Sequence, residues 1–139
     1  MVIEHHGEQD VFLHHWYDIP HGEQGMSEAL LEHISARFRL LGEPLRLKIL
    51  AALASGERSA GELATLVDAS QPNVSKHLTA LTQGGIVSRR KVGTSIYYTI
   101  TDESVLELCD VVCAKVRQQF AAKARELGMD TSHRTQEVL

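Results

Sequence analysis

The segment from Ser59 to Ile100 constrains the fold more than any other part of the chain. Its first half has apolar residues at helical spacing in two short stretches, separated by a polar turn at residues 68–70. Its second half is rich in β-forming residues around a Gly-Thr-Ser turn, which predicts a β-hairpin over residues 86–100. Helix, tight turn, helix and hairpin, in that order, outline a winged helix-turn-helix, in which one helix enters the major groove of DNA.

Each of the two short helices has a serine at its start. Ser59 stands three residues before a glutamate, the spacing of a capping box, and predicts a helix over residues 60–67. Ser70, followed by a proline in the first turn, predicts a helix over residues 71–83 that stops at a Gly-Gly pair. The apolar residues of this second helix are spaced by three or four and are expected to face the core: Val74, Leu78 and Leu81.

Helical patterns also flank this segment on both sides. One covers residues 27–41, a second begins with Pro44 in its first turn, and a long one covers residues 103–127. The last has a stripe of apolar or thiol side chains at Val105, Leu108, Cys109, Val112, Val116 and Phe120. We therefore expect an α+β fold that is mainly α, with about five helices and a β-hairpin wing.

The ends of the chain are polar and differ from its middle. We expect residues 1–25 to form a partly flexible extension, residues 26–128 a winged-helix domain for DNA binding and dimerisation, and residues 129–139 a flexible tail. No apolar run reaches the length of a membrane span, and the first residues lack a signal-peptide pattern. These features predict a cytoplasmic protein without a membrane partner.

The charge distribution favours nucleic acid as a partner, although the average charge does not. The formal net charge is −4, yet residues 71–100 contain four basic side chains and no Asp or Glu. DNA responds to the local field, so a basic face on an acidic body is compatible with DNA binding. Such binding should weaken strongly with salt, because counterions are released from the phosphates.

The polar face of the helix over residues 71–83 and the basic strand that follows it are the predicted DNA contacts. Helix side chains would contact phosphates and base edges, and the hairpin would contact phosphates or the minor groove. The full set is Gln71, Asn73, Ser75, Lys76, His77, Thr79, Arg89, Arg90, Lys91 and Thr94. The alternative is a winged-helix module that dimerises or docks on protein without inducible DNA binding. No nucleophile–base pair or phosphate-binding glycine loop occurs, so an enzyme is not expected.

Several strings in the chain resemble the ArsR/SmtB family of winged-helix repressors. They are LGEPLRLKILAAL (41–53), ELA (62–64), SQPNVSKHLTALTQGGIVSRRKVG (70–93) and IYYTI (96–100). The resemblance covers roughly residues 27–120. It implies a homodimer, formed through the first and last helices, that represses transcription at a palindromic operator. It also implies release of the operator when an effector binds.

The known metal-binding patterns of that family are missing here. Its thiolate site is a Cys-x-Cys string on the third helix, which in this chain reads SAGELATLV. Its last-helix site begins with an Asp followed two residues later by a His, whereas Asp102 is followed by Ser104. We therefore expect any effector site to lie elsewhere.

Cys109 and Cys113 are the tentative effector residues, and three interpretations stay open. Being four residues apart, they lie on one helix face. They could be small core residues, or thiolate ligands for a soft ion such as Zn, Cd, Ni or arsenite, with a third ligand or a partner subunit. They could also sense oxidants, although an intrahelical disulfide would need local unwinding or a bond between subunits.

The N-terminal extension is the second candidate for metal binding. It is rich in histidine, and imidazole suits both Zn and Ni, so these residues could bind metal alone or complete a thiol site. They could equally be idle solvated side chains. The residues are His5, His6, His14, His15 and His21.

Overall fold

The computed structural model describes residues 27–128. The expectations for the N-terminal extension, its five histidines and the C-terminal tail lie outside that range. The chain divides between Pro44 and Leu45 into two units. The described part of the first unit, residues 27–44, contains helix α2 (Glu28–Leu41). This helix begins as expected at Ser27, whose hydroxyl oxygen accepts a hydrogen bond from the Leu30 N–H at 3.2 Å.

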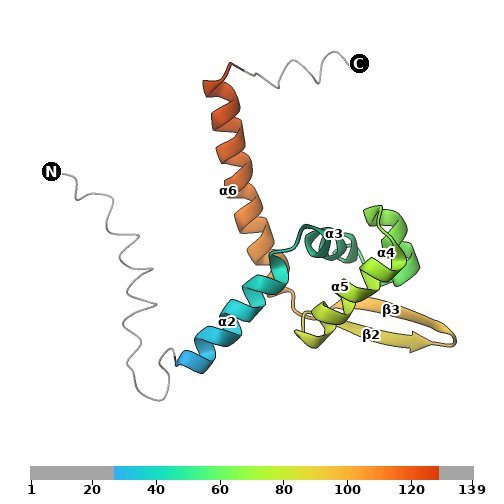
Figure 1. The fold of residues 1–139 in the computed structure, drawn as a ribbon. Coiled ribbons are helices and arrows are strands. Elements are labelled where there is room, and N and C mark those ends of the chain that lie inside the picture. The colour runs from blue at the N-terminus through green and yellow to red at the C-terminus, as the bar shows by residue number, and fades with distance from the viewer. Residues whose placement is uncertain (1–26, 129–139) are drawn as a thin grey trace, which may run out of the picture. The chain divides into compact units, whose positions relative to one another are not determined.

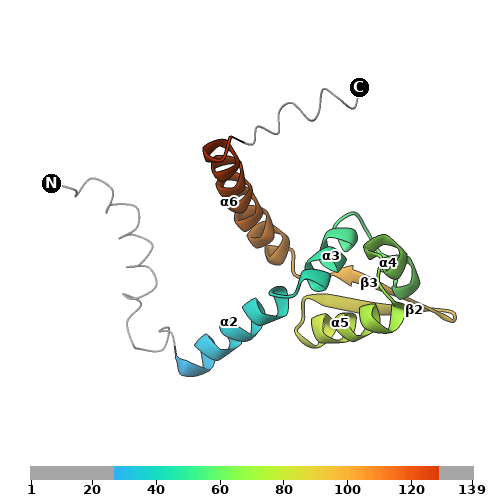
Figure 2. The same ribbon diagram turned by 45° about the horizontal axis from the view of Figure 1, so that its top comes forward.

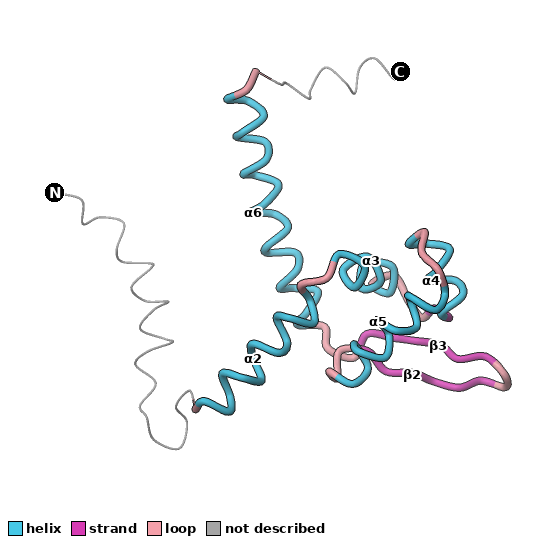
Figure 3. Tube along the Cα trace, in the orientation of Figure 1, coloured by secondary structure: helices cyan, strands magenta, loops and turns pink. Residues whose placement is uncertain are grey.

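The second unit contains the helix-turn-helix and the hairpin. Its elements are α3 (Pro44–Leu53), β1 (Arg58–Ser59), α4 (Ala60–Val67), α5 (Gln71–Gln83), β2 (Val87–Val92), β3 (Ser95–Ile100) and α6 (Ser104–Glu126) (Figures 1 and 3). Within residues 27–128, five helices and the hairpin confirm the predicted α+β architecture. Strand β1 was not predicted, because two residues are too few to show a period.

The two helices of the helix-turn-helix start where their serines predict. The Ser59 hydroxyl accepts a hydrogen bond from the Glu62 N–H at 3.2 Å, and Ser70 accepts one from the Asn73 N–H at 3.3 Å. These bonds satisfy backbone donors that a helix start leaves unpaired. Asp68 ends α4 in the left-handed region at φ 54°, a conformation that Asp tolerates better than most residues, and so turns the chain toward α5.

The three strands form one antiparallel sheet in the order β1-β3-β2. Strands β2 and β3 pair from Val87 with Ile100 to Val92 with Ser95. The connecting turn therefore has two residues, one fewer than expected, because Ser95 joins the ladder. Gly93 has φ +62° in this turn, which suits a two-residue hairpin turn with glycine first. Figures 1 and 2 show this turn projecting beyond α4 and α5.

A small apolar core fixes the orientation of α5. Its three apolar residues, Val74, Leu78 and Leu81, are fully buried, as predicted. The other large side chains of this core come from α3, α4 and the start of the hairpin: Ile49, Leu50, Leu63 and Ile86. Truncating such a residue to alanine costs about 2–5 kcal/mol, so the rotation of α5 about its own axis is strongly specified.

Helix α6 leaves most of its apolar stripe uncovered. Val105 is buried, but Val112 is 53% exposed, Val116 40% and Phe120 71%. A continuous apolar stripe on a helix normally packs against another element. Neither α6 nor any other helix within residues 27–128 is long and apolar enough to cross a membrane.

Candidate nucleic-acid interface

The outer face of α5 presents most of the predicted DNA contacts. Because the buried residues fix the opposite face, four of the predicted side chains are exposed: Gln71, Asn73, Lys76 and Thr79. Ser75 and His77 are half-buried at the two flanks of this face. The first turn of α5 contains no acidic residue, so its positive dipole end is not neutralised there.

Thr79 has only acceptor capacity left on this face. Its hydroxyl donates to the Ser75 carbonyl oxygen at 2.9 Å, one turn back along the helix. The hydroxyl proton is thereby used, and what Thr79 presents outward is a methyl group and oxygen lone pairs. A thymine methyl or an amino group of a base would suit such a surface.

His77 is tied to α3 by a residue that sequence reasoning missed. The Arg46 Nε donates to the His77 Nδ1 at 3.0 Å, and both side chains are half-buried. The two residues are 31 positions apart, so no local pattern could have joined them. Arg46 lies within the string LGEPLRLKILAAL, which pointed to the family but assigned this arginine no role.

The three basic residues of β2 do not share one environment. Arg90 pairs with Glu57: its Nε donates to Oε2 at 3.2 Å, and its Nη2 donates to Oε1. This hydrogen bond, with the charge of Glu57, raises the pKa of Arg90. Arg89 and Lys91 alternate with Arg90 and so point to the opposite face of the strand.

Arg89 and Lys91 are therefore the wing cations available for phosphate. Both are exposed, and within residues 27–128 the structure places no carboxylate in an ion pair with either. Thr94, in the turn, is exposed as well. The hairpin thus has one face with two unneutralised cations and another where Glu57 offsets Arg90.

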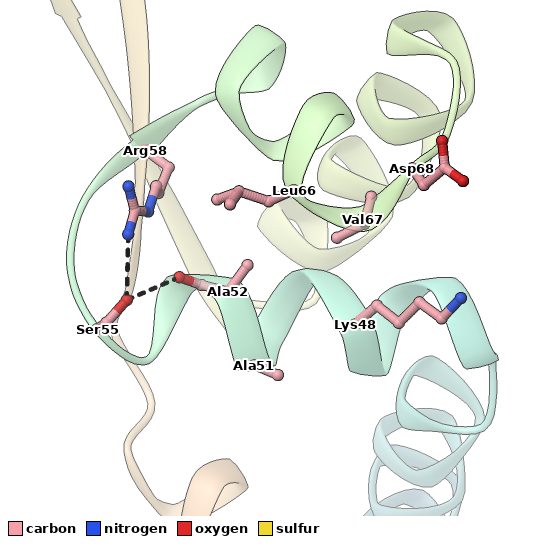
Figure 4. Close-up of a pocket in the computed structure, with 8 residues that line it drawn as sticks. All are labelled: Lys48, Ala51, Ala52, Ser55, Arg58, Leu66, Val67 and Asp68. Carbon is pink, nitrogen blue, oxygen red and sulfur yellow. Dashed lines mark hydrogen bonds between the residues drawn. The ribbon is translucent and has the colours of Figure 1, made fainter. Parts of the chain in front are cut away.

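An open groove of about 470 Å³ lies between α3 and α4. Figure 4 shows Arg58 and Ser55 at one end, Lys48 and Asp68 at the other. The Arg58 Nη2 donates to the Ser55 hydroxyl at 3.3 Å. No predicted DNA or effector residue lines this groove. We assign it no ligand.

The two thiols differ in their surroundings on α6. Cys109 is half-buried and Cys113 is exposed. Burial is the main cause that raises the pKa of the Cys109 thiol, and the nearby Asp110 and Cys113 raise it further. In the part of the chain that the structure describes, no three His, Cys, Asp or Glu side chains are placed to hold a metal ion together.

Comparison with known proteins points to one family. The family model described as bacterial regulatory protein, arsR family, matches residues 43–89. A probable mercury resistance operon repressor from Streptomyces lividans is 41% identical over 71 residues, which are 51% of this chain and 57% of that protein. A biofilm growth-associated repressor from Agrobacterium fabrum is 32% identical over 81 residues, which are 58% of this chain and 69% of that protein.

A solved structure resembles the fold over most of its own length. It is the homodimeric winged helix-turn-helix DNA-binding domain of a possible ArsR-family transcriptional regulator from Mycobacterium bovis. The TM-score is 0.64 at 32% identity, covering 73% of this chain and 94% of that domain. The chain spans about half the length of several relatives that it matches, from 40% to 57% in three of them.

Proposed function

The chain belongs to the ArsR family of bacterial regulatory proteins, and from that premise we propose that it is a homodimeric transcriptional repressor. The observation that carries this proposal is the polar outer face of α5, held in place by three fully buried residues. The wing cations Arg89 and Lys91 supply the second contact to DNA. The operator would be palindromic, because a two-fold symmetric dimer reads two equivalent half-sites.

The proposed contacts divide between base edges and phosphates. The side chains on α5 would read bases and adjacent phosphates in the major groove, and those of the wing would contact phosphates. The contacting residues are Gln71, Asn73, Ser75, Lys76, His77, Thr79, Arg89, Lys91 and Thr94. Arg90 is left out of this set because Glu57 already offsets its charge. Its proposed role is to support the wing through the ion pair with Glu57.

The proposed dimer uses the first and last described helices. Exposed apolar side chains on α2, such as Leu30 and Phe38, and those on α6, such as Val116 and Phe120, need a partner surface. The matched Mycobacterium bovis domain is described as homodimeric. In such a dimer the two copies of α5, the proposed recognition helix, would be one DNA turn apart, about 34–36 Å.

The proposed effector acts on Cys109 and Cys113. Two effector chemistries fit a thiol pair one helical turn apart: a soft metal ion or metalloid, and an oxidant. The first is supported by a relative described as a mercury resistance operon repressor. Since one protomer offers two thiols within residues 27–128, a soft ion would need a further ligand. The partner subunit or the N-terminal histidines would supply it.

A paired charge-removal experiment tests the DNA interface. An operator is first selected from a random DNA library with the full-length protein, and binding is then measured by fluorescence anisotropy across a salt series. We expect Lys76→Ala with Arg89→Ala to lower affinity and to flatten the salt dependence. The slope should fall by about 0.9 for each phosphate that the variant no longer neutralises.

The matched control removes the same charge from α6, as Lys115→Ala with Arg117→Ala. Both control residues are exposed, and neither lies on the proposed interface with DNA. If the two double variants bind the operator equally well, the DNA interface proposed here is wrong. If neither the parent nor any variant binds DNA while the dimer forms, the protein-interaction module is the better interpretation.

A further inference from the structure

An arginine and a tyrosine are direct neighbours on one face of the wing. In the ladder between β2 and β3, Tyr98 is directly opposite Arg89. The next pair in the ladder is Tyr97 opposite Arg90. Directly opposite residues share a face of the sheet, with Cβ atoms about 4.5–5.5 Å apart, whereas successive residues point to opposite faces. Each tyrosine thus has an arginine as its cross-strand neighbour, and the two pairs lie on opposite faces.

The hydroxyl of Tyr98 is unbonded and reaches solvent. Within residues 27–128 the structure gives this hydroxyl no hydrogen bond. In that part of the chain, the Arg58 Nε is the one buried side-chain nitrogen or oxygen that lacks a hydrogen bond. The unbonded Tyr98 oxygen is therefore not buried, although the residue as a whole is half-buried. A half-buried ring has already lost part of its rotamer freedom, which lowers the entropic cost of binding through its hydroxyl.

Arg89 is the cation that is available beside this hydroxyl. It is exposed, and within residues 27–128 no carboxylate forms an ion pair with it. Arg58 of β1 is opposite Tyr98 on the other side, but it is in an ion pair with Glu62 at 3.9 Å. The cross-strand pair of Arg89 and Tyr98 therefore offers an unneutralised guanidinium and a hydroxyl donor on one face of the sheet.

We propose that Tyr98 is a further DNA-contacting residue, and that Tyr98 and Arg89 together bind one phosphate of the operator backbone. The inference rests on the proposed function, in which the wing lies against DNA. A backbone phosphate has two non-bridging oxygens that share one negative charge, so it can accept from a guanidinium and from a hydroxyl at the same time. Arginine and tyrosine are both among the side chains that contact DNA phosphates.

The pair on the other face, Arg90 and Tyr97, is unsuited to the same role. Glu57 accepts hydrogen bonds from two guanidinium nitrogens of Arg90, so the charge of this arginine is offset. A phosphate that approached Arg90 would also meet the Glu57 carboxylate, and like charges repel. The two tyrosines are adjacent in β3, and both are half-buried. Tyr97 is therefore a matched control for Tyr98.

The first experiment compares Tyr98→Phe with Tyr97→Phe, because each variant loses one hydroxyl and keeps the ring. Binding of the full-length protein to its selected operator is measured by fluorescence anisotropy across a salt series, with circular dichroism as the check on folding. We expect Tyr98→Phe to weaken binding about fivefold, the factor for one hydrogen bond, and Tyr97→Phe to leave binding unchanged. Because Tyr98→Phe removes no charge, the weakening should be the same at every salt concentration.

The second experiment tests whether the two residues bind the same phosphate. The phosphates of the selected operator are replaced one at a time by uncharged methylphosphonates. We expect one replacement that weakens binding of the parent to have a smaller effect in both Tyr98→Phe and Arg89→Met. Lys91→Met removes the next cation on the same face of β2 and should lower the overall affinity. It should nevertheless keep the parent's full response at that one phosphate.

The outcomes separate this inference from the proposed function. If the parent binds its operator and the two phenylalanine variants bind it equally well, the phosphate contact of Tyr98 is wrong and the repressor stands. If Tyr98→Phe and Arg89→Met lose their response at different phosphates, the shared phosphate is wrong and the repressor again stands. If the parent binds no DNA, the shared phosphate falls together with the proposed function.

Discussion

Single side chains decide how much positive charge the wing presents to DNA. Glu57 offsets Arg90, and we expect Glu57→Gln to tighten operator binding and to steepen its salt dependence, because one more cation then faces the phosphates. Anisotropy titrations across a salt series measure both effects. The pair is exposed, so the melting temperature should change little.

The matched control for Glu57→Gln is Glu103→Gln, which removes the same charge from an exposed carboxylate ahead of α6. Equal tightening in the two variants would show that overall charge, and not the Glu57–Arg90 pair, sets the effect. Weaker binding in Glu57→Gln would show that the wing needs the ion pair in order to hold its shape.

Ser70 determines where the recognition helix begins. Ser70→Ala removes the acceptor for the Asn73 N–H, and we expect the free energy of unfolding to fall by about 1 kcal/mol. Urea denaturation followed by circular dichroism measures this change. Ser95→Ala, at an exposed strand position, makes the same chemical change away from any helix start and should cost less. Equal losses would contradict the capping role.

Local signals in the sequence predicted the helix-turn-helix, whereas contacts between residues far apart in the sequence were not predicted. The serine caps at residues 59 and 70 act within one turn, so the sequence alone predicts both helix starts. Strand β1 exists only because it pairs with β3, and the shorter hairpin turn follows from the pairing of Ser95 with Val92. Arg46 and Glu57 contact residues 31 and 33 positions away, beyond any periodic pattern.

The exposed stripe of α6 is expected to be a subunit interface. Val116→Lys places a charge within the stripe and should shift the protein from dimer to monomer, since burying an unpaired charge is costly. Analytical ultracentrifugation measures the change in mass. Val111→Lys, five residues away and thus on the other side of the helix, is the matched control, and Val111 is 69% exposed. Dimers in both variants would place the interface elsewhere.

For the chain as a whole, the recognition face and the proposed effector residues depend on different levels of structure. The recognition face follows from helix periodicity and the core, which are local and strongly specified. Cys109 and Cys113, in contrast, acquire a function only from what surrounds them in the assembled protein. Within residues 27–128 they lack a third metal ligand from their own protomer. Sensing, if it uses these thiols, would therefore be a property of the dimer or of the N-terminal histidines.

Cadmium binding to the dimer and to a monomeric variant distinguishes these two sources of the missing ligand. If the partner subunit supplies it, Val116→Lys should lose the ultraviolet absorbance of cadmium–thiolate bonds, and Val111→Lys should keep it. If the histidines supply it, both variants should bind cadmium. Affinity should rise with pH, because metal binding displaces the thiol proton and the pKa of Cys109 is raised by burial. Unaltered cadmium binding in Cys109→Ser with Cys113→Ser would show that the thiols are not metal ligands. Their only role would then be to form part of the apolar stripe of α6.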